Sequence, residues 1–357
     1  MPEDANPLEH DVPSLIADAV GFLHGMQRED GLFCLERVRG DAAPRGRSVR
    51  YSLMTYIGLA KAERSGLEHG FDLDAIRAAL WSELDSPELD PGDFGLYLWA
   101  DAVRGPAAEG ADLAGRAERA FAAAGGLQAH EGQEVSWLAI GLSHHPATRE
   151  ASLRRAALDE LLGRLEPATG LLYHYGGSHP RRRFANFATE SYSTLALAIA
   201  AKDGDETARS AARGVADRLI ALQRADGGWP WLYDVRRGGV VEPYEVYSVH
   251  QHAMAPMALL QLAEASGDPR YEEAARRGLR WIDGRNELGL DMVDEGEQLI
   301  YRSIRRRRPL DRVVLYGNTA AAYVFGHGLS LAGRGIELNA TCRPYELGWL
   351  LEAWCGR

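Results

Sequence analysis

The stretch Leu222-Gln223-Arg224-Ala225-Asp226-Gly227-Gly228-Trp229 ends an amphipathic helical pattern, and weaker copies of it recur along the chain. The copies begin at Met26, Leu165 and Trp281, and each contains a glycine suited to the left-handed backbone that stops a helix. After three of the four copies, a Tyr-Ser pair opens a new apolar helix: Tyr51-Ser52, Tyr192-Ser193 and Tyr247-Ser248. This recurring unit of helix, loop, Tyr-Ser and helix predicts a repeat architecture.

Apolar spacing predicts helices through almost all of the chain. The predicted ranges are 13–27, 50–65, 73–84, 93–104, 111–124, 133–144, 148–164, 189–202, 206–223, 246–266, 269–282, 314–331 and 344–355. Alternate helices are apolar all round, as inner helices are, and those between them carry Arg, Glu and Ala on one face. We therefore predict an all-α, (α/α)6 toroid of about twelve helices in six pairs, forming a single domain over residues 1–357. Long loops at 28–49, 165–188, 224–245 and 283–312 are expected on one rim.

The composition of the chain limits which classes of protein it can belong to. The 357 residues are 46% hydrophobic, enough for a large core, and carry a net charge of −11. A phosphate-backbone binder would normally be basic, so nucleic acid is not expected as a partner. The chain has neither an apolar run of about 18 residues nor a signal-peptide pattern, and its three cysteines are expected to be reduced thiols. These features predict a cytoplasmic protein without a membrane span, and they leave its oligomeric state open.

The segment from Gln223 to Trp231 resembles the Gln-Trp repeat of squalene–hopene cyclases and protein prenyltransferase β-subunits. It is also similar to the Gln-x-x-x-Gly-Gly-Trp-Pro segment of helical-toroid polysaccharide lyases. Both groups have α/α-toroid folds, so the resemblance implies the fold more than a reaction. It also implies a structural role for Trp229, since the motif tethers neighbouring helices.

The differences between this sequence and the motifs of those families also bear on its function. The Asp-x-Asp-Asp acid motif of class II terpene cyclases has its nearest match in Asp72-Leu73-Asp74-Ala75, which lacks the second Asp of the pair. The zinc ligands of prenyltransferases have no counterpart, because the cysteines have no nearby His. We therefore predict neither a metal nor another cofactor. Walker, HExxH, GxSxG and CxxC motifs are also missing from the sequence.

The densest group of reactive side chains spans residues 242–252, ahead of an apolar helix. A carboxylate, imidazole or phenol in a dry cavity can act as a general acid or base, because the surroundings of a buried group tune its pKa. We predict Glu245 and His250 as catalytic residues and Tyr247 as a proton donor. The alternative is that Glu245 caps a helix and His250 hydrogen-bonds in the core. His250 and His252 would point to different helix faces, which argues against a shared metal.

Two further carboxylates occupy equivalent places before other inner helices. Glu190 lies two residues before the Tyr of its Tyr-Ser pair, as Glu245 does, and Glu134 precedes Ser136. Carboxylates gathered at one mouth suit glycoside chemistry, where a paired acid and base flank the scissile bond. Glu134 and Glu190 are therefore further catalytic candidates. The alternative is acidic charge at helix N-termini, which is a common pattern.

Aromatic and cationic residues near these carboxylates are predicted to bind the substrate. Sugar rings stack on aromatic faces and hydrogen-bond through their hydroxyls, whereas a terpene pocket would hold fewer ionised groups. The arginine clusters 181–183 and 305–308 suggest an anionic substrate, with solvated surface charge as the alternative. Arg302 is expected to face inward, because Tyr301 and Ile304 frame it. The predicted substrate-binding residues are Tyr175, Arg183, Tyr192, Trp231 and Arg302.

Together these patterns favour a carbohydrate-active enzyme on a glycan or oligosaccharide. It would be a hydrolase, a lyase or an epimerase that uses acid–base chemistry in the toroid mouth. One alternative is a terpenoid cyclase or prenyl-substrate enzyme, which requires a deep apolar cavity. The other is a non-catalytic glycan-binding or scaffold protein, which would have an open, shallow mouth.

Overall fold

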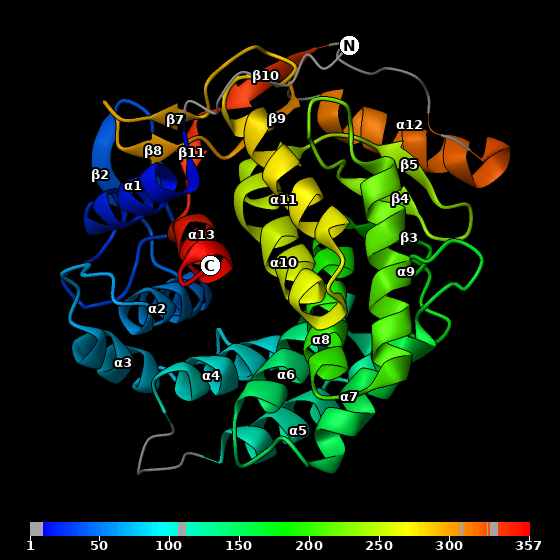
Figure 1. The fold of residues 1–357 in the computed structure, drawn as a ribbon, viewed down its shortest axis with the longest axis horizontal. Helices are drawn as coiled ribbons and strands as arrows, with labels where there is room; N and C mark the ends of the chain where they lie inside the picture. The colour runs from blue at the N-terminus through cyan, green and yellow to red at the C-terminus, as the bar shows by residue number, and fades with distance from the viewer. Residues whose placement is uncertain (1–9, 106–111, 308–309, 327, 329–334) are drawn as a thin grey trace.

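The chain folds into an α/α toroid, in which a ring of inner helices is covered by outer helices (Figure 1). The computed structural model describes all residues except 1–9, 106–111, 308–309, 327 and 329–334. The inner helices are α2 (Val49–Arg64), α4 (Pro91–Arg104), α6 (Gly132–His144), α8 (Phe187–Lys202), α10 (Ala255–Ser266) and α13 (Pro344–Trp354). The outer helices are α1 (Val12–His24), α3 (Leu73–Trp81), α5 (Leu113–Ala123), α7 (Ser152–Gly163), α9 (Glu206–Leu222) and α11 (Pro269–Ile282). The predicted alternation of inner and outer helices is confirmed.

Close contacts between glycines let the inner helices form a ring. Each inner helix contacts the next one, and α13 contacts α2. A Cβ placed on Gly58 of α2 would lie 1.9 Å from the carbonyl oxygen of Gly348 on α13. Similarly, a Cβ on Gly141 of α6 would lie 2.2 Å from the carbonyl oxygen of Gly95 on α4. Only glycine permits such backbone approach, so these positions determine how tightly the ring closes.

The recurring motif stops one helix and ties it to the next. The side-chain amide of Gln223 donates to the carbonyl of Gly227 at 2.9 Å and to that of Ala274 on α11 at 3.1 Å. Gly227 has a φ of 90°, and a Cβ there would lie 2.2 Å from the carbonyl oxygen of Arg277. In the first copy of the motif, Gln27 donates to Gly31 at 3.4 Å. Trp229 is fully buried, so it lies within the core.

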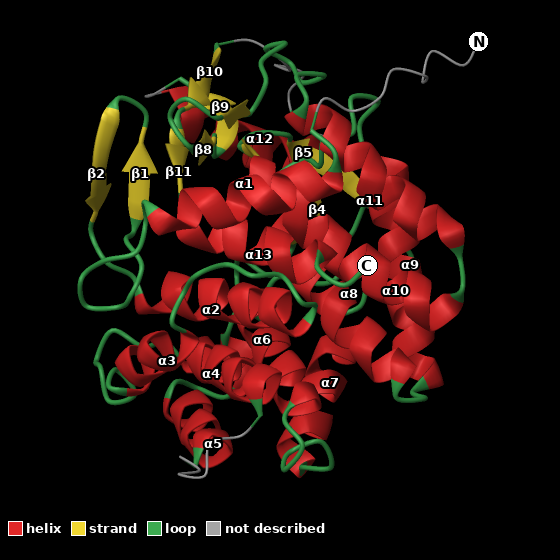
Figure 2. Ribbon diagram, turned by 60° about the vertical axis from the view of Figure 1, so that its left-hand side comes forward, coloured by secondary structure: helices red, strands yellow, loops and turns green. Residues whose placement is uncertain are grey.

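The connections that lead into α2, α8, α10 and α13 contain short strands, which lie on one rim (Figure 2). Three small antiparallel sheets have the orders β11-β1-β2, β10-β9-β6 and β3-β4-β5, and β7 pairs with β8. The strands are β1 (Glu36–Val38), β2 (Asp41–Arg45), β3 (Phe184–Asn186), β4 (Leu232–Asp234), β5 (Gly239–Glu242), β6 (Val246–Tyr247), β7 (Val293–Asp294), β8 (Leu299–Ile300), β9 (Ser303–Arg306), β10 (Ile336–Asn339) and β11 (Thr341–Cys342). The pairing gives hydrogen-bond partners to backbone groups of these loops.

The predicted helix 246–266 is interrupted. Val246 and Tyr247 form β6 against β9, and a single π-helical turn, His250–Met254, precedes α10. Pro256 explains part of this interruption of the α-helix, since it has no N–H to donate to the carbonyl of His252, four residues earlier. That carbonyl instead accepts a hydrogen bond from the indole nitrogen of Trp354 at 2.7 Å.

One further helix, α12 (Leu310–Phe325), lies outside the ring (Figure 1). It was predicted at 314–331, of which residues 327 and 329–331 lie outside the described part of the chain. It contacts β5 and β9 on the rim. The three cysteines, Cys34, Cys342 and Cys355, are buried and unpaired. Within the described part of the chain, no helix combines the length and apolar character needed to cross a membrane.

Candidate functional site

A cavity of about 190 Å³ opens where the inner helices begin. Its wall includes the three tyrosines of the Tyr-Ser pairs, which the repeat brings to equivalent places: Tyr51, Tyr192 and Tyr247. Gln133 and Trp137 of α6 and Tyr345 of α13 complete much of the remaining wall. The repeat thus places equivalent aromatic side chains around one opening.

Two guanidinium groups line this cavity, and each pairs with a buried carboxylate. Arg50 donates from Nε to Asp93 at 2.6 Å. Arg302 donates from Nη1 to Glu346, and its guanidinium carbon lies 4.8 Å from the ring centroid of Tyr247. Both carboxylates are 1% exposed, and among the described lining residues none is Asp or Glu. The charged groups of the described wall are therefore both guanidinium groups, which only donate hydrogen bonds, and they stand among aromatic side chains.

His250 brings an imidazole to the same wall. Its Nδ1 is buried and has no hydrogen-bond partner among the described residues. Trp231 stacks parallel to the imidazole, with centroids 5.9 Å apart, and the Tyr247 ring lies 5.0 Å away. Burial, and then the positive charge of Arg302, hold the pKa of His250 well below its usual value. At neutral pH the imidazole is therefore uncharged and keeps a lone pair.

Tyr247 and Trp231 also line a second cavity of about 170 Å³, which Glu245 borders. The Tyr247 hydroxyl donates to Glu245 Oε2 at 3.0 Å. Glu245 Oε1 accepts from Asn339 at 3.0 Å and from Ser303. Burial and the negative charge of Glu245 raise the pKa of Tyr247, so the phenol stays protonated. The structure thus brings together Glu245, Tyr247 and His250, three of the predicted catalytic residues.

Glu190 and Glu134, the other two, lie elsewhere. Glu190 is fully buried and accepts from the backbone N–H of Leu172 at 3.1 and 3.2 Å. Burial raises its pKa well above the usual value. Glu134 accepts from the N–H of Glu131 at 3.3 Å and contacts His130 at 3.1 Å, in the capping box of α6. Neither residue lines either cavity.

The predicted substrate-binding residues also fall into two groups, those that line the first cavity and those that do not. Tyr192, Trp231 and Arg302 line the first cavity, with Arg302 facing inward as expected. Tyr175 lies outside both cavities and donates to Glu131 at 2.9 Å.

Arg183 is likewise outside the cavities and pairs with Asp234 at 2.6 Å. It also donates to the carbonyl of Ala322 on α12 at 3.3 Å, so it joins a strand of the rim to that helix. In the second arginine cluster, Arg308 lies outside the described residues.

Several cavity residues were missed. Arg50, Gln133 and Tyr345 lie on three different inner helices and were not predicted as site residues. Tyr51 carried a usable signal, because it belongs to the same Tyr-Ser repeat as Tyr192 and Tyr247. For Arg50 and Gln133 the sequence offers no comparable signal.

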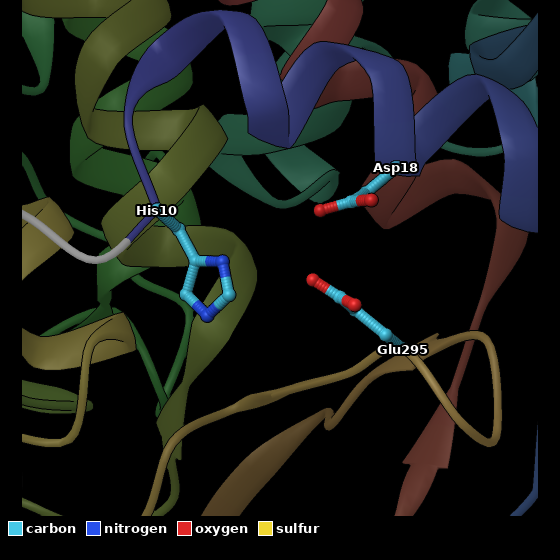
Figure 3. A group of neighbouring side chains, drawn as sticks. All are labelled: His10, Asp18 and Glu295. Carbon is cyan, nitrogen blue, oxygen red and sulfur yellow. The ribbon is translucent and has the colours of Figure 1, made fainter.

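A group that could hold a metal ion lies away from both cavities (Figure 3). It consists of His10, Asp18 of α1 and Glu295 from the connection between β7 and β8, with ligand atoms within 4.8 Å of one another. His10 is already paired through Nε2 with Asp291 at 2.8 Å. Hydrogen bonding and charge attraction from Asp291 raise the pKa of His10 against the opposing effect of burial. The ion pair with Asp291 therefore accounts for the position of the His10 imidazole.

No family model and no curated protein sequence matches the chain. Among solved structures, cellobiose 2-epimerase from Bacillus thermoamylovorans B4167 is similar, with a TM-score of 0.64 and 10% identity, covering 96% of this chain and 98% of that one. Unsaturated glucuronyl hydrolase from Bacillus sp. GL1 gives a TM-score of 0.63 and 16% identity, with 96% of each chain covered. A sugar epimerase from a ruminal bacterium gives 0.60 and 11%, covering 96% of this chain and 97% of that one. These similarities confirm the toroid fold.

Proposed function

We propose that the protein is a carbohydrate-active enzyme that moves a proton on an anionic sugar, as a lyase or an epimerase does. The observation that carries the proposal is the uncharged imidazole of His250 in a cavity lined by Arg50 and Arg302 and by no described carboxylate. The similar solved structures include two sugar epimerases and a glucuronyl hydrolase, which supports the substrate class as an analogy.

His250 is the proposed base. A neutral imidazole has a lone pair that can accept a proton from a carbon next to a carbonyl or carboxylate group, and a bound anion beside it would raise its lowered pKa toward the operating pH. The negative charge that then develops on the substrate oxygens would be stabilised by the guanidinium groups of Arg50 and Arg302. Tyr247 keeps its proton at neutral pH, and its contact with Glu245 orients the hydroxyl. It is the second group proposed to exchange a proton with the substrate.

Hydrolysis is less well supported by this geometry. A glycosidase of the usual kind needs two carboxyl groups that face each other across the scissile bond. No described carboxylate lines the first cavity, and Glu190 is fully buried and lines neither cavity. Of the carboxylates in the second cavity, Glu242 is held by Arg306 and Asn318, and Glu245 by Tyr247, Ser303 and Asn339.

The terpenoid alternative also fits poorly. Two guanidinium groups, an imidazole and the amide of Gln133 line the first cavity, whereas a prenyl chain requires apolar walls. The donor-rich wall instead suits a ligand rich in acceptor atoms, such as a sugar carboxylate.

Proton exchange with solvent tests the proposal. The protein would be incubated in D2O with uronic acids, sugar phosphates and neutral sugars, and the sugars examined by NMR. With the wild type we expect deuterium at one carbon of an anionic sugar, or an unsaturated sugar if the reaction is an elimination, and neither with His250→Asn. Hydrolysis products without deuterium incorporation would contradict the proposed chemistry, and prenyl-diphosphate turnover would contradict the substrate class.

A further inference from the structure

The second cavity has a different chemical character from the first, although Trp231 and Tyr247 line both. Its lining includes three carboxylates, Glu242, Glu245 and Asp311, and three arginines. Carboxylates accept hydrogen bonds and guanidinium groups donate them, so this wall offers both kinds of partner. In the first cavity the charged groups, Arg50 and Arg302, only donate hydrogen bonds.

Two of the arginines that line the second cavity are paired within the protein. Arg306 pairs with Glu242 at 2.9 Å, and both side chains are almost fully buried. Arg305 pairs with Glu337 at 3.2 Å. The carboxylate of Glu245 accepts from the neutral donors Tyr247, Ser303 and Asn339, so its negative charge disfavours an anion in this cavity, which the first cavity's wall does not do. The wall instead suits an uncharged ligand whose hydroxyl groups both donate and accept.

One wall of the second cavity is supplied by α12, the helix outside the ring. Leu315 of α12 lines the cavity. Asn318 of the same helix is 1% exposed and donates to Glu242, which fixes the helix to β5. Arg237 adds a hydrogen bond to the carbonyl of Ala322 at 2.6 Å. The cavity is therefore built by packed and hydrogen-bonded elements.

We infer that the second cavity binds an uncharged sugar unit joined to the anionic sugar that occupies the first cavity. This inference rests on the proposed function and adds to it the size and chemistry of the substrate. Trp231 offers an aromatic surface at the boundary of the two cavities, and its ring centroid lies 5.2 Å from that of Tyr247. A linkage that crosses this boundary would place the charged unit beside Arg302 and the neutral unit beside Leu315. The substrate is thus at least a disaccharide with one acidic unit.

Calorimetric titration of glucuronate and of a panel of disaccharides that join a uronic acid to a neutral sugar tests the inference. With the wild type, the best disaccharide should bind about tenfold more tightly than glucuronate, a difference of about 1.4 kcal/mol. Leu315→Trp fills the second cavity and should remove this advantage while the affinity for glucuronate stays unchanged. Val313→Trp is the matched control, since Val313 lies on the same helix and is 69% exposed.

The possible results distinguish failure of the second sugar site from failure of the proposed function. If glucuronate and every disaccharide bind equally well to the wild type, or if Leu315→Trp weakens both equally, the second sugar site is wrong and the proposed function stands. If no sugar binds and none exchanges deuterium, the proposed function fails, and the inference fails with it. Glucose 6-phosphate in the same titration tells whether the first cavity prefers a carboxylate or a phosphate.

Discussion

The indole nitrogen of Trp354 donates a 2.7 Å hydrogen bond to the backbone carbonyl of His252, which joins the closing helix of the ring to the π-helical turn. This turn begins with His250, so the contact lies two residues from the proposed base within the same turn. π-Helical turns are rare and frequently occur at functional sites. The bond therefore links closure of the ring to the position of the imidazole.

Replacing Trp354 with Phe should destabilise the protein and misplace His250. The buried carbonyl of His252 would lose its indole donor, which costs about 1–3 kcal/mol. Chemical denaturation would measure the loss, and turnover should fall more through kcat than through KM, because His250 acts in the chemical step. An unchanged kcat would contradict the link between the closing helix and the base.

His252 should make the protein sensitive to acid. It is fully buried, neither ring nitrogen has a partner among the described residues, and burial lowers its pKa from 6.5 to about 3. Between these values the unfolded state binds more protons, so stability is lost as the pH falls below about 6.5. At pH 5 the loss is about 2 kcal/mol, from a difference of about 1.5 pH units at 1.36 kcal/mol per unit.

The variant His252→Leu should remove the share of this acid sensitivity that His252 contributes, about 2 kcal/mol at pH 5, while His250 and His144, whose pKa values are also lowered, keep theirs. Melting temperatures at pH 8 and pH 5 would measure it, and the difference between the two should shrink in the variant. A difference as large as that of the wild type would show that other groups cause the acid loss.

Gly58→Ala should prevent normal closure of the ring. The new methyl group would meet the backbone of Gly348, which cannot move aside as a side chain can, so we expect a loss of about 3 kcal/mol or more. Gly21→Ala is the control, because Gly21 lies in α1 with no atom within 4 Å of a Cβ. That change should stabilise the protein by about 0.5–1 kcal/mol. Equal melting temperatures for the two variants would contradict the role of the Gly58 contact.

Glu245→Gln and Glu190→Gln should differ in activity. Glu245 orients the hydroxyl of Tyr247, and loss of that function should lower kcat by about a hundredfold, as should Tyr247→Phe. Among the described residues, the Glu190 carboxylate accepts hydrogen bonds from the backbone of Leu172 alone, and it lines neither cavity, so its variant should keep its kcat. Rate assays on variants whose circular dichroism spectra match that of the wild type would test this difference in kcat. A loss in Glu190→Gln equal to that in Glu245→Gln would restore Glu190 as a catalytic candidate.

Spacing alone predicted equivalent roles for Glu190 and Glu245, each two residues before a Tyr. Secondary structure makes these roles different. Two residues on a helix differ by about 200° in direction, so Glu190 points away from the cavity that Tyr192 lines. In an extended segment, residues two apart share a face, and Glu245 therefore meets the hydroxyl of Tyr247. Choosing between these outcomes required knowing that 246–247 form a strand, which depends on pairing with β9.

Local patterns predicted the parts of the structure that depend on near neighbours. Apolar periodicity gave the inner and outer helices, and the segment 242–252 held the central site residues because they are close in sequence. The joint lining of the cavity by Arg50, Gln133 and Tyr345 depends on ring closure, which no local pattern encodes. The strand pairing of 303–306 with 336–339 has the same origin.

Closure of the ring by α13 also has a kinetic consequence. The hydrogen bond from Arg343 to Tyr51 joins residues 292 positions apart, and Lys61 and Glu352 are 291 apart. Contacts between such distant residues form late, because the chain must first lose the entropy of a very long loop. We therefore expect the first cavity, whose wall includes both Tyr51 and Tyr345, to be completed late in folding, so that ligand binding reports that last step.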